Sequence, residues 1–350
     1  MPRLRKSDCS GPGIRRRRRG KGFEYLNGNG NKVRRQAVLT RIDELRIPPA
    51  WKDVWICSDE LGHLQATGVD AAGRKQYLYH PQWRARRDQE KFDEMIDFAR
   101  SLPQMRERVA RDLRKRSMNR ERVLACAVRL LDRGFFRVGG EDYAVENESY
   151  GLATMRREHV TVERSGAITF DYPAKSGQRR VQSLVDPDVV KVVRELKRRR
   201  GGGDELLAYK NGGRWRDVRS ADINAYVKEV TGGDFSAKDF RTWNATVLAA
   251  VALAVSGQSK QSKNARKRAA TRAVKEVAHY LGNTPAVCRN SYIDPRVFDR
   301  FQGGLTIGGV LPEFVESVES DNAALQGAVE DAVLDLIEND TRSPALEKAA

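Results

Sequence analysis

The sequence contains Lys238-Asp239-Phe240-Arg241-Thr242-Trp243, then Leu281-Gly282-Asn283-Thr284-Pro285, and then Ser291-Tyr292, and these three strings decide its interpretation. Two further strings lie upstream: Phe135-Phe136-Arg137-Val138-Gly139 and Pro173-Ala174-Lys175-Ser176-Gly177. The side chains in them that suit work on a phosphate are Arg137, Lys175, Arg241, Asn283 and Tyr292. Their order and local context predict one catalytic site for a phosphodiester.

The chemistry of a phosphodiester explains why these residue types belong together. Its negative oxygens repel a nucleophile and an alkoxide leaves poorly, so a metal-free enzyme needs fixed cations, a nucleophile and an acid. Arg137 and Arg241 can each hold two phosphate oxygens and always stay charged. The Tyr292 phenol suits the nucleophile, and the Lys175 ammonium can protonate the leaving oxygen. A tyrosyl-phosphate bond would keep the energy of the broken bond, so resealing would need no ATP.

Each of these residues also has an ordinary structural interpretation. Tyr292 alone fits a core or rim residue, and arginines in so basic a chain are commonly solvated or hold phosphates without catalysis. Lys175 alone fits a solvated hairpin tip, and Asn283 after a glycine fits a helix C-cap. The shared order of all the strings favours the catalytic interpretation.

The same strings resemble those of the type IB DNA topoisomerases, the poxvirus and bacterial branch in particular, over most of residues 37 to 304. The resemblance implies an enzyme that nicks one strand of duplex DNA through a 3′-phosphotyrosyl bond at Tyr292, lets the strand rotate, and reseals it. It implies that Arg137 and Arg241 stabilise the transition state and that Lys175 is the general acid. Supercoils of both signs would relax without ATP, metal or cofactor.

Asn283 departs from the poxvirus pattern, which has His between the Gly and the Thr-Pro. The spacing to Tyr292 is unchanged. An amide can donate a hydrogen bond to a non-bridging phosphate oxygen, but it carries neither a transferable proton nor a charge. We therefore expect Asn283 to stabilise the transition state by hydrogen bonding and to take no part in acid or base catalysis. His279 has the wrong offset to replace the missing histidine and is interpreted as structural.

DNA-contacting residues are expected in two places. The string Gly73-Arg74-Lys75-Gln76-Tyr77-Leu78-Tyr79-His80 interleaves cations, an amide and aromatic rings, as a groove-contacting surface would. The resemblance implies this role for its glutamine and tyrosines, with packing of alternating aromatics on a sheet as the alternative. Gly140 stands where the poxvirus enzyme has a base-contacting lysine, so cleavage is expected to be less selective. The candidates are Arg74, Lys75, Gln76, Tyr77, Tyr79, Tyr143 and Lys238.

Composition also points to nucleic acid. The chain has 350 residues and a formal charge of +17, an excess that suits a polyanion such as double-stranded DNA. We find no long apolar span, signal peptide or basic amphipathic helix that would indicate a membrane. The cysteines lack metal-ligand or redox spacing, so we expect no metal site and an intracellular, cytoplasmic and nucleoid-associated protein. The sequence identifies no protein partner.

The predicted fold class is α+β, with two lobes that close as a clamp around duplex DNA. Residues 1–36 are expected to form a basic arm without regular structure, and residues 37–90 a small antiparallel β-rich lobe. Residues 91–310 are expected to form a mainly α-helical catalytic lobe with a short sheet, with a flexible basic segment at 256–268. The acidic tail, 311–350, has the spacing of an amphipathic helix. Folding back on the body, partner binding and modulation of DNA affinity all stay open for it.

Two other functions fit parts of the pattern. Tyrosine recombinases share the catalytic chemistry, but they carry His where this chain has Lys238, and they lack the string around Tyr77. A basic DNA-compacting protein with an inert Tyr292 is the non-enzymatic alternative. Plasmid relaxation in EDTA would separate the three, since only the topoisomerase should relax DNA efficiently.

Overall fold

The computed structural model describes residues 3–141, 144–145, 148–257, 262–312 and 326–348. The chain divides into two compact units, Met1–Lys91 and Phe92–Ala350, and the division falls within helix α2 (Pro81–Leu113). The first unit is built on an antiparallel sheet and the second on helices with small sheets, so the predicted α+β class is confirmed. Closure around DNA stays a prediction.

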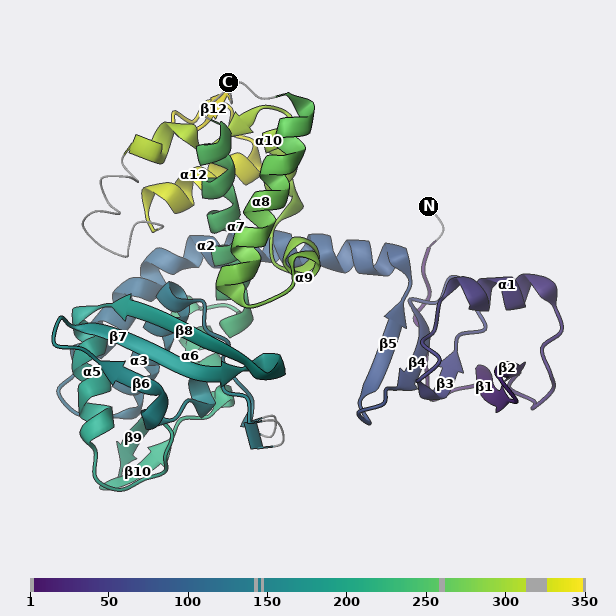
Figure 1. Cartoon of the computed structure of the whole chain (residues 1–350), viewed down its shortest axis with the longest axis horizontal. Helices are drawn as coiled ribbons and strands as arrows, with labels where there is room; N and C mark the ends of the chain where they lie inside the picture. The colour runs from purple at the N-terminus through teal and green to yellow at the C-terminus, as the bar shows by residue number, and fades with distance from the viewer. Residues whose placement is uncertain (1–2, 142–143, 146–147, 258–261, 313–325, 349–350) are drawn as a thin grey trace. The chain divides into compact units, whose positions relative to one another are not determined.

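A five-stranded antiparallel sheet in the order β2-β1-β3-β4-β5 forms the first unit (Figure 1). One helix, α1 (Gln36–Glu44), packs on it through Ile42, which is buried with Ile14, Val54 and Ile56 of the sheet. The alternating strings around Trp55, Ala66 and Tyr77 predict the last three strands. The strands are β1 (Ile14–Arg19), β2 (Gly22–Leu26), β3 (Lys52–Ile56), β4 (Leu64–Val69) and β5 (Lys75–Tyr79).

The arginine run forms strand β1, so the expectation that the arm at 1–36 lacks regular structure is wrong there. Side chains of this run form hydrogen bonds and ion pairs that the number of charges in the sequence does not predict. Arg16 donates to the carbonyl of Trp51 at 2.7 Å, and Arg17 pairs with Glu24 on β2 at 2.7 Å. Because these partners offset the repulsion between neighbouring cations, the run can pair as a strand.

The second unit surrounds two largely buried helices, α3 (Arg120–Gly134) and α7 (Ala237–Gly257). Figure 1 shows α8 running beside α7, and the two helices are in contact. Further helices in the described part of this unit are α5 (Pro187–Arg198), α6 (Ser220–Thr231), α8 (Lys263–Leu281), α9 (Pro285–Ser291), α10 (Pro295–Gln302) and α12 (Ala328–Glu338). Short 3-10 turns occur at Leu152–Thr154, Arg157–His159 and Gly308–Val310.

A three-stranded antiparallel sheet, β6-β7-β8, covers α3. Its strands are β6 (Val160–Val162), β7 (Ala167–Ala174) and β8 (Gln178–Val185), as the sequence predicts. The tip between β7 and β8 is a 3-10 turn, Lys175–Gly177, so Lys175 does lie at a hairpin tip. Two small pairs complete the unit: β9 (Ala208–Asn211) with β10 (Arg214–Asp217), and β11 (Leu305–Thr306) with β12 (Glu347–Lys348).

The basic segment at 256–268 differs from the expected flexible insertion. Residues 258–261 lie outside the described residues, but α7 extends to Gly257 and α8 begins at Lys263, so most of the described part of the segment is helical. The hydroxyl of Ser262 accepts a hydrogen bond from the amide of Ala265 and so caps the helix. The cap and the alanines that follow favour a helix despite the lysines and arginines.

Helix α12, within the acidic tail, packs onto the rest of the second unit, which agrees with the fold-back alternative for this part of the tail. Its apolar face is buried against α7 and α10. Glu330 is 7% exposed and accepts from the Trp243 indole of α7 at 2.8 Å. The same carboxylate pairs with Arg106 of α2 at 2.5 Å, and Arg106 also pairs with Asp132 of α3 at 2.9 Å. One buried network therefore joins α2, α3, α7 and α12.

Replacing Glu330 by Ala should lower the free energy of unfolding by about 1–3 kcal/mol, because the buried Trp243 N–H and one side of Arg106 lose their acceptor. Asp331→Ala, at an exposed neighbour on the same helix, should change it by no more than about 0.5 kcal/mol. Urea denaturation followed by tryptophan fluorescence measures both. Equal stability of the two variants would contradict the role given to the network.

Candidate active site

Arg137 lies on a loop whose course depends on close backbone contacts. Helix α3 ends at Phe135 in the left-handed conformation (φ 54°), which turns the chain toward the site. The amide of Leu152 donates to the Arg137 carbonyl at 2.8 Å. Beside this bond a Cβ on Gly151 would lie 2.4 Å from the backbone nitrogen of Gly139, so only glycine lets the two segments approach.

The Arg137 guanidinium is held by the junction between α8 and α9. Its Nη2 donates to the carbonyl of Gly282 at 2.7 Å and to Oδ1 of Asn283. Gly282 is in the left-handed conformation (φ 60°) at the C-cap of α8, the role that the sequence offered for its neighbour Asn283. Since Oδ1 accepts from Arg137, the amide nitrogen Nδ2 faces the other way. That nitrogen is buried and has no hydrogen-bond partner among the described residues.

Arg241 lies on the first turns of α7 and is only 4% exposed. Its Nη1 donates to the carbonyl of Phe135 at 2.7 Å, and its Nη2 donates to the carbonyl of Leu281 at 3.0 Å. Burial and the nearby Arg137 charge lower the pKa of Arg241 to about 10, while Tyr292 acts in the opposite direction. At neutral pH the guanidinium therefore stays charged in a place that already disfavours further positive charge.

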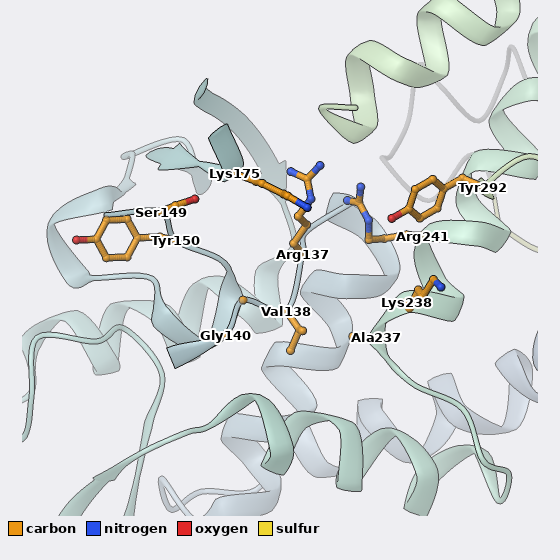
Figure 2. Close-up of a pocket in the computed structure, with 11 residues that line it drawn as sticks. Arg137, Val138, Gly140, Ser149, Tyr150, Lys175, Ala237, Lys238, Arg241 and Tyr292 are labelled. Atoms are coloured by element: carbon orange, nitrogen blue, oxygen red, sulfur yellow. The ribbon is translucent and has the colours of Figure 1, made fainter. Parts of the chain in front are cut away.

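Tyr292 follows α9 directly, and its ring lies against Arg241. The Arg241 guanidinium carbon is 5.3 Å from the ring centroid (Figure 2). The backbone is fixed from both sides: the Tyr292 amide donates to Cys288 at 3.0 Å, and the Tyr292 carbonyl lies 3.3 Å from the hydroxyl of Thr246. The phenol is thus set beside a buried cation by two neighbouring helices.

Lys175, Arg137, Arg241 and Tyr292 line one pocket of about 310 Å³. Figure 2 shows the exposed Lys175 side chain extending toward Arg137. These four residues come from four separate segments of the chain. Asn283 is not among the residues that line the pocket, but its Oδ1 accepts a hydrogen bond from Arg137, which does line it. The pocket is large enough for a phosphate group and is bordered by four cationic side chains, those of Arg137, Lys175, Lys238 and Arg241.

Thr246 has a role at this site that the sequence strings did not indicate. It is fully buried in α7, and its hydroxyl accepts from the amide of Asp294 at 3.1 Å while lying near the Tyr292 carbonyl. A threonine in the interior of a helix is an ordinary residue in a sequence. The sequence indicates its place only by its position, five residues after Arg241.

The other DNA-contact candidates separate in the structure. On β5 the side chains of Lys75, Tyr77 and Tyr79 share one face, where the two tyrosine rings stack with centroids 6.2 Å apart. Gln76 lies on the opposite face and donates to Asp70 at 2.9 Å, and Arg74 pairs with the same carboxylate at 3.0 Å. Lys238 is exposed and lines the catalytic pocket. Tyr143 lies outside the described residues.

Comparison with known proteins shows which family the chain belongs to. A family model described as "Eukaryotic DNA topoisomerase I, catalytic core" matches residues 80–303, and one described as "Bacterial DNA topoisomerase IB, N-terminal domain" matches residues 22–70. The DNA topoisomerase 1B of Acanthamoeba polyphaga mimivirus is 32% identical over 320 residues, which cover 89% of this chain and 91% of the viral protein. The chain belongs to the type IB DNA topoisomerase family.

More distant topoisomerases match a shorter stretch. DNA topoisomerase 1 of Candidozyma auris is 30% identical over 156 residues, 43% of this chain and 20% of the yeast protein. DNA topoisomerase 1 of Daucus carota is 28% identical over 130 residues, 37% of this chain and 15% of the plant protein. The family membership predicted from the sequence is confirmed. Among the described residues no helix is long and apolar enough to span a membrane.

Proposed function

We propose that this chain relaxes supercoiled duplex DNA by reversible nicking at Tyr292. The observation that carries the proposal is the pocket of about 310 Å³ where Arg137, Lys175, Arg241 and Tyr292 meet. The predicted site of DNA relaxation is the cytoplasm, at the nucleoid, and both units are proposed to contact the duplex. In the first unit the contact surface is the face of β5 that carries Lys75, Tyr77 and Tyr79.

The chemical step exchanges one phosphoester for another. The Tyr292 oxygen attacks phosphorus, its phenolic proton passes to water, and the bond from phosphorus to the 5′ oxygen breaks. Lys175 donates a proton to that oxygen, so a free 5′ hydroxyl leaves and a 3′-phosphotyrosyl bond remains. Resealing is the same step in reverse, which needs no ATP because a phosphoester is conserved throughout.

The two arginines stabilise the transition state in this scheme. Negative charge grows on the non-bridging oxygens as the fifth bond to phosphorus forms, and fixed guanidiniums beside it need no reorganisation. Arg241 is held by two backbone carbonyls and Arg137 by one carbonyl and an amide oxygen. Their positions are therefore set before DNA arrives.

Asn283 adds an uncharged donor to this arrangement. Its Oδ1 orients Arg137, and its buried Nδ2 has no partner among the described residues. A buried N–H without an acceptor costs about 1–3 kcal/mol, so a site that keeps one gains from a ligand that accepts it. A non-bridging phosphate oxygen is the acceptor we propose.

Tyr292→Phe should retain DNA binding and lose nicking, because only the phenolic oxygen is removed. The wild-type chain should relax both positively and negatively supercoiled plasmid in EDTA without ATP, whereas the variant should leave the plasmid supercoiled. Agarose gels follow relaxation, and a denaturing gel detects the covalent complex. A covalent complex in the variant would assign the nucleophile elsewhere, and wild-type protein that binds but does not relax DNA would favour the recombinase or compacting alternative.

Asn283→Asp keeps the acceptor for Arg137 but replaces the donor by a carboxylate oxygen, so cleavage should slow by roughly 10² or more. Asn290→Asp adds the same charge at an exposed position of α9 and should have a much smaller effect. Single-turnover cleavage at a mapped site measures both rates. An Asn283→Asp variant that cleaves as fast as Asn290→Asp would exclude phosphate hydrogen bonding by Asn283.

Lys175→Ala should cleave ordinary DNA slowly but cleave DNA with sulfur in place of the bridging 5′ oxygen at nearly the wild-type rate. A thiolate leaves without a proton, so the general acid becomes dispensable. Arg241→Ala is the matched comparison, since charge on the non-bridging oxygens still develops and its defect should persist on both substrates. Equal defects of Lys175→Ala on both would make this lysine a phosphate-binding residue instead.

A further inference from the structure

Arg180 of β8 donates hydrogen bonds to the same end of α8 as Arg137 and Arg241, the two arginines of the pocket. Its Nη1 donates to the carbonyl of His279 at 2.7 Å, and its Nη2 donates to the carbonyl of Tyr280. The next two carbonyls along the chain accept from Arg241 and Arg137. Four successive carbonyls at the end of α8 are thus occupied by three guanidiniums.

The electrostatics of a helix end explain why a guanidinium is stable here. The last carbonyls of a helix have no partner within it and carry the negative end of the helix dipole. Arg180 is half-buried, and its pKa is lowered chiefly by that burial, with Arg137 adding to the effect and Tyr172 opposing it. Its two backbone bonds offset the loss of water.

Gly282 leaves the space that Arg180 needs. A Cβ on Gly282 would lie 3.2 Å from Nη1 of Arg180, tighter than ordinary contact, and the residue has φ 60°. The glycine of the Gly282-Asn283 pair therefore serves two purposes, since it ends α8 and admits the guanidinium from β8.

Arg180 sits five positions after Lys175 on the strand that leads out of the hairpin tip. On its other side the hairpin is fixed to α3 and its loop: Gln182 donates to the carbonyl of Gly134, and the amide of Tyr150 donates to Pro173 at 2.9 Å. The Arg180 bonds join the same hairpin to α8. They connect the element that carries the lysine to the junction that holds the arginines.

We propose that Arg180 is a positioning residue for the general acid: it holds the β7–β8 hairpin against the end of α8, so that Lys175 reaches the 5′ oxygen of the phosphate gripped by Arg137 and Arg241. The proposal rests on the role given above to Lys175. Arg180 itself touches no reacting atom. Its removal should therefore affect only the proton transfer that Lys175 performs.

Arg180→Ala should slow single-turnover cleavage of ordinary DNA by roughly 10- to 100-fold, the effect expected when a catalytic group is displaced by about 1 Å. On DNA with sulfur at the bridging 5′ position its rate should return to within about threefold of wild type. Arg180→Ala combined with Lys175→Ala should be no slower than Lys175→Ala alone, because both changes remove one function.

Arg179→Ala is the control. Arg179 precedes Arg180 on β8, is exposed, and pairs with Asp171 across the same hairpin at 2.5 Å, so its removal takes the same charge from the same strand without touching α8. It should leave the sulfur-to-oxygen rate ratio at the wild-type value. Arg180→Lys keeps the charge and one donor group, so it should show a smaller defect with the same recovery on sulfur, and it replaces the alanine variant if that variant does not fold.

The outcomes are distinct. Equal slowing of Arg180→Ala on both substrates, with Lys175→Ala still recovered by sulfur, would make Arg180 a phosphate or folding residue and overturn the proposal alone. Wild-type cleavage of ordinary DNA by Arg180→Ala would also overturn it. Failure of sulfur to recover Lys175→Ala would remove the general acid from Lys175, and the positioning role of Arg180 would fall with it.

Discussion

Positive charges must be held close together here before any phosphate arrives, and the C-terminal end of α8 makes that possible. Arg137 and Arg241 repel one another, and burial together with the Arg137 charge lowers the pKa of Arg241. Backbone carbonyls of α8 accept hydrogen bonds from both. The carbonyl oxygens at the helix end carry partial negative charge, which stabilises each guanidinium and fixes its orientation.

In this arrangement the guanidiniums are fixed in place during folding, and binding of the phosphate is a separate, later event. A mobile guanidinium would lose conformational entropy each time it binds a phosphate. One that is already hydrogen-bonded to the backbone has lost that entropy during folding. Folding of α7 and α8 around a buried core therefore supplies part of the stabilisation that the reaction later uses. The Asn283 side chain is also fixed before a phosphate binds, because its Oδ1 accepts a hydrogen bond from Arg137.

Local strings predicted the candidate site, because Arg137, Lys175, Arg241, Asn283 and Tyr292 each lie in a short pattern of their own, and four of these side chains line one pocket. The strands around Trp55 and Tyr77 and the hairpin at Lys175 were also predictable, since alternation and turn residues are local properties. Contacts between segments that are distant in the sequence could not be predicted. The Arg15–Arg19 run looked disordered because its partner Glu24 and the neighbouring strand act only after folding. Arg180 resembled any other arginine until α8 was placed beside it.

The Trp243–Glu330 bond has a consequence for how the protein is made. A ribosome produces Trp243 well before Glu330, which lies 87 positions later in the chain, and Tyr292 lies in the interval. The nascent chain thus carries Tyr292, the proposed nucleophile, before the helix that closes the network with α2, α3 and α7 has been made. The packing of the second unit is therefore completed after Tyr292 has been synthesised. The proposed active site is fully packed only once the segment that stabilises this unit has been translated.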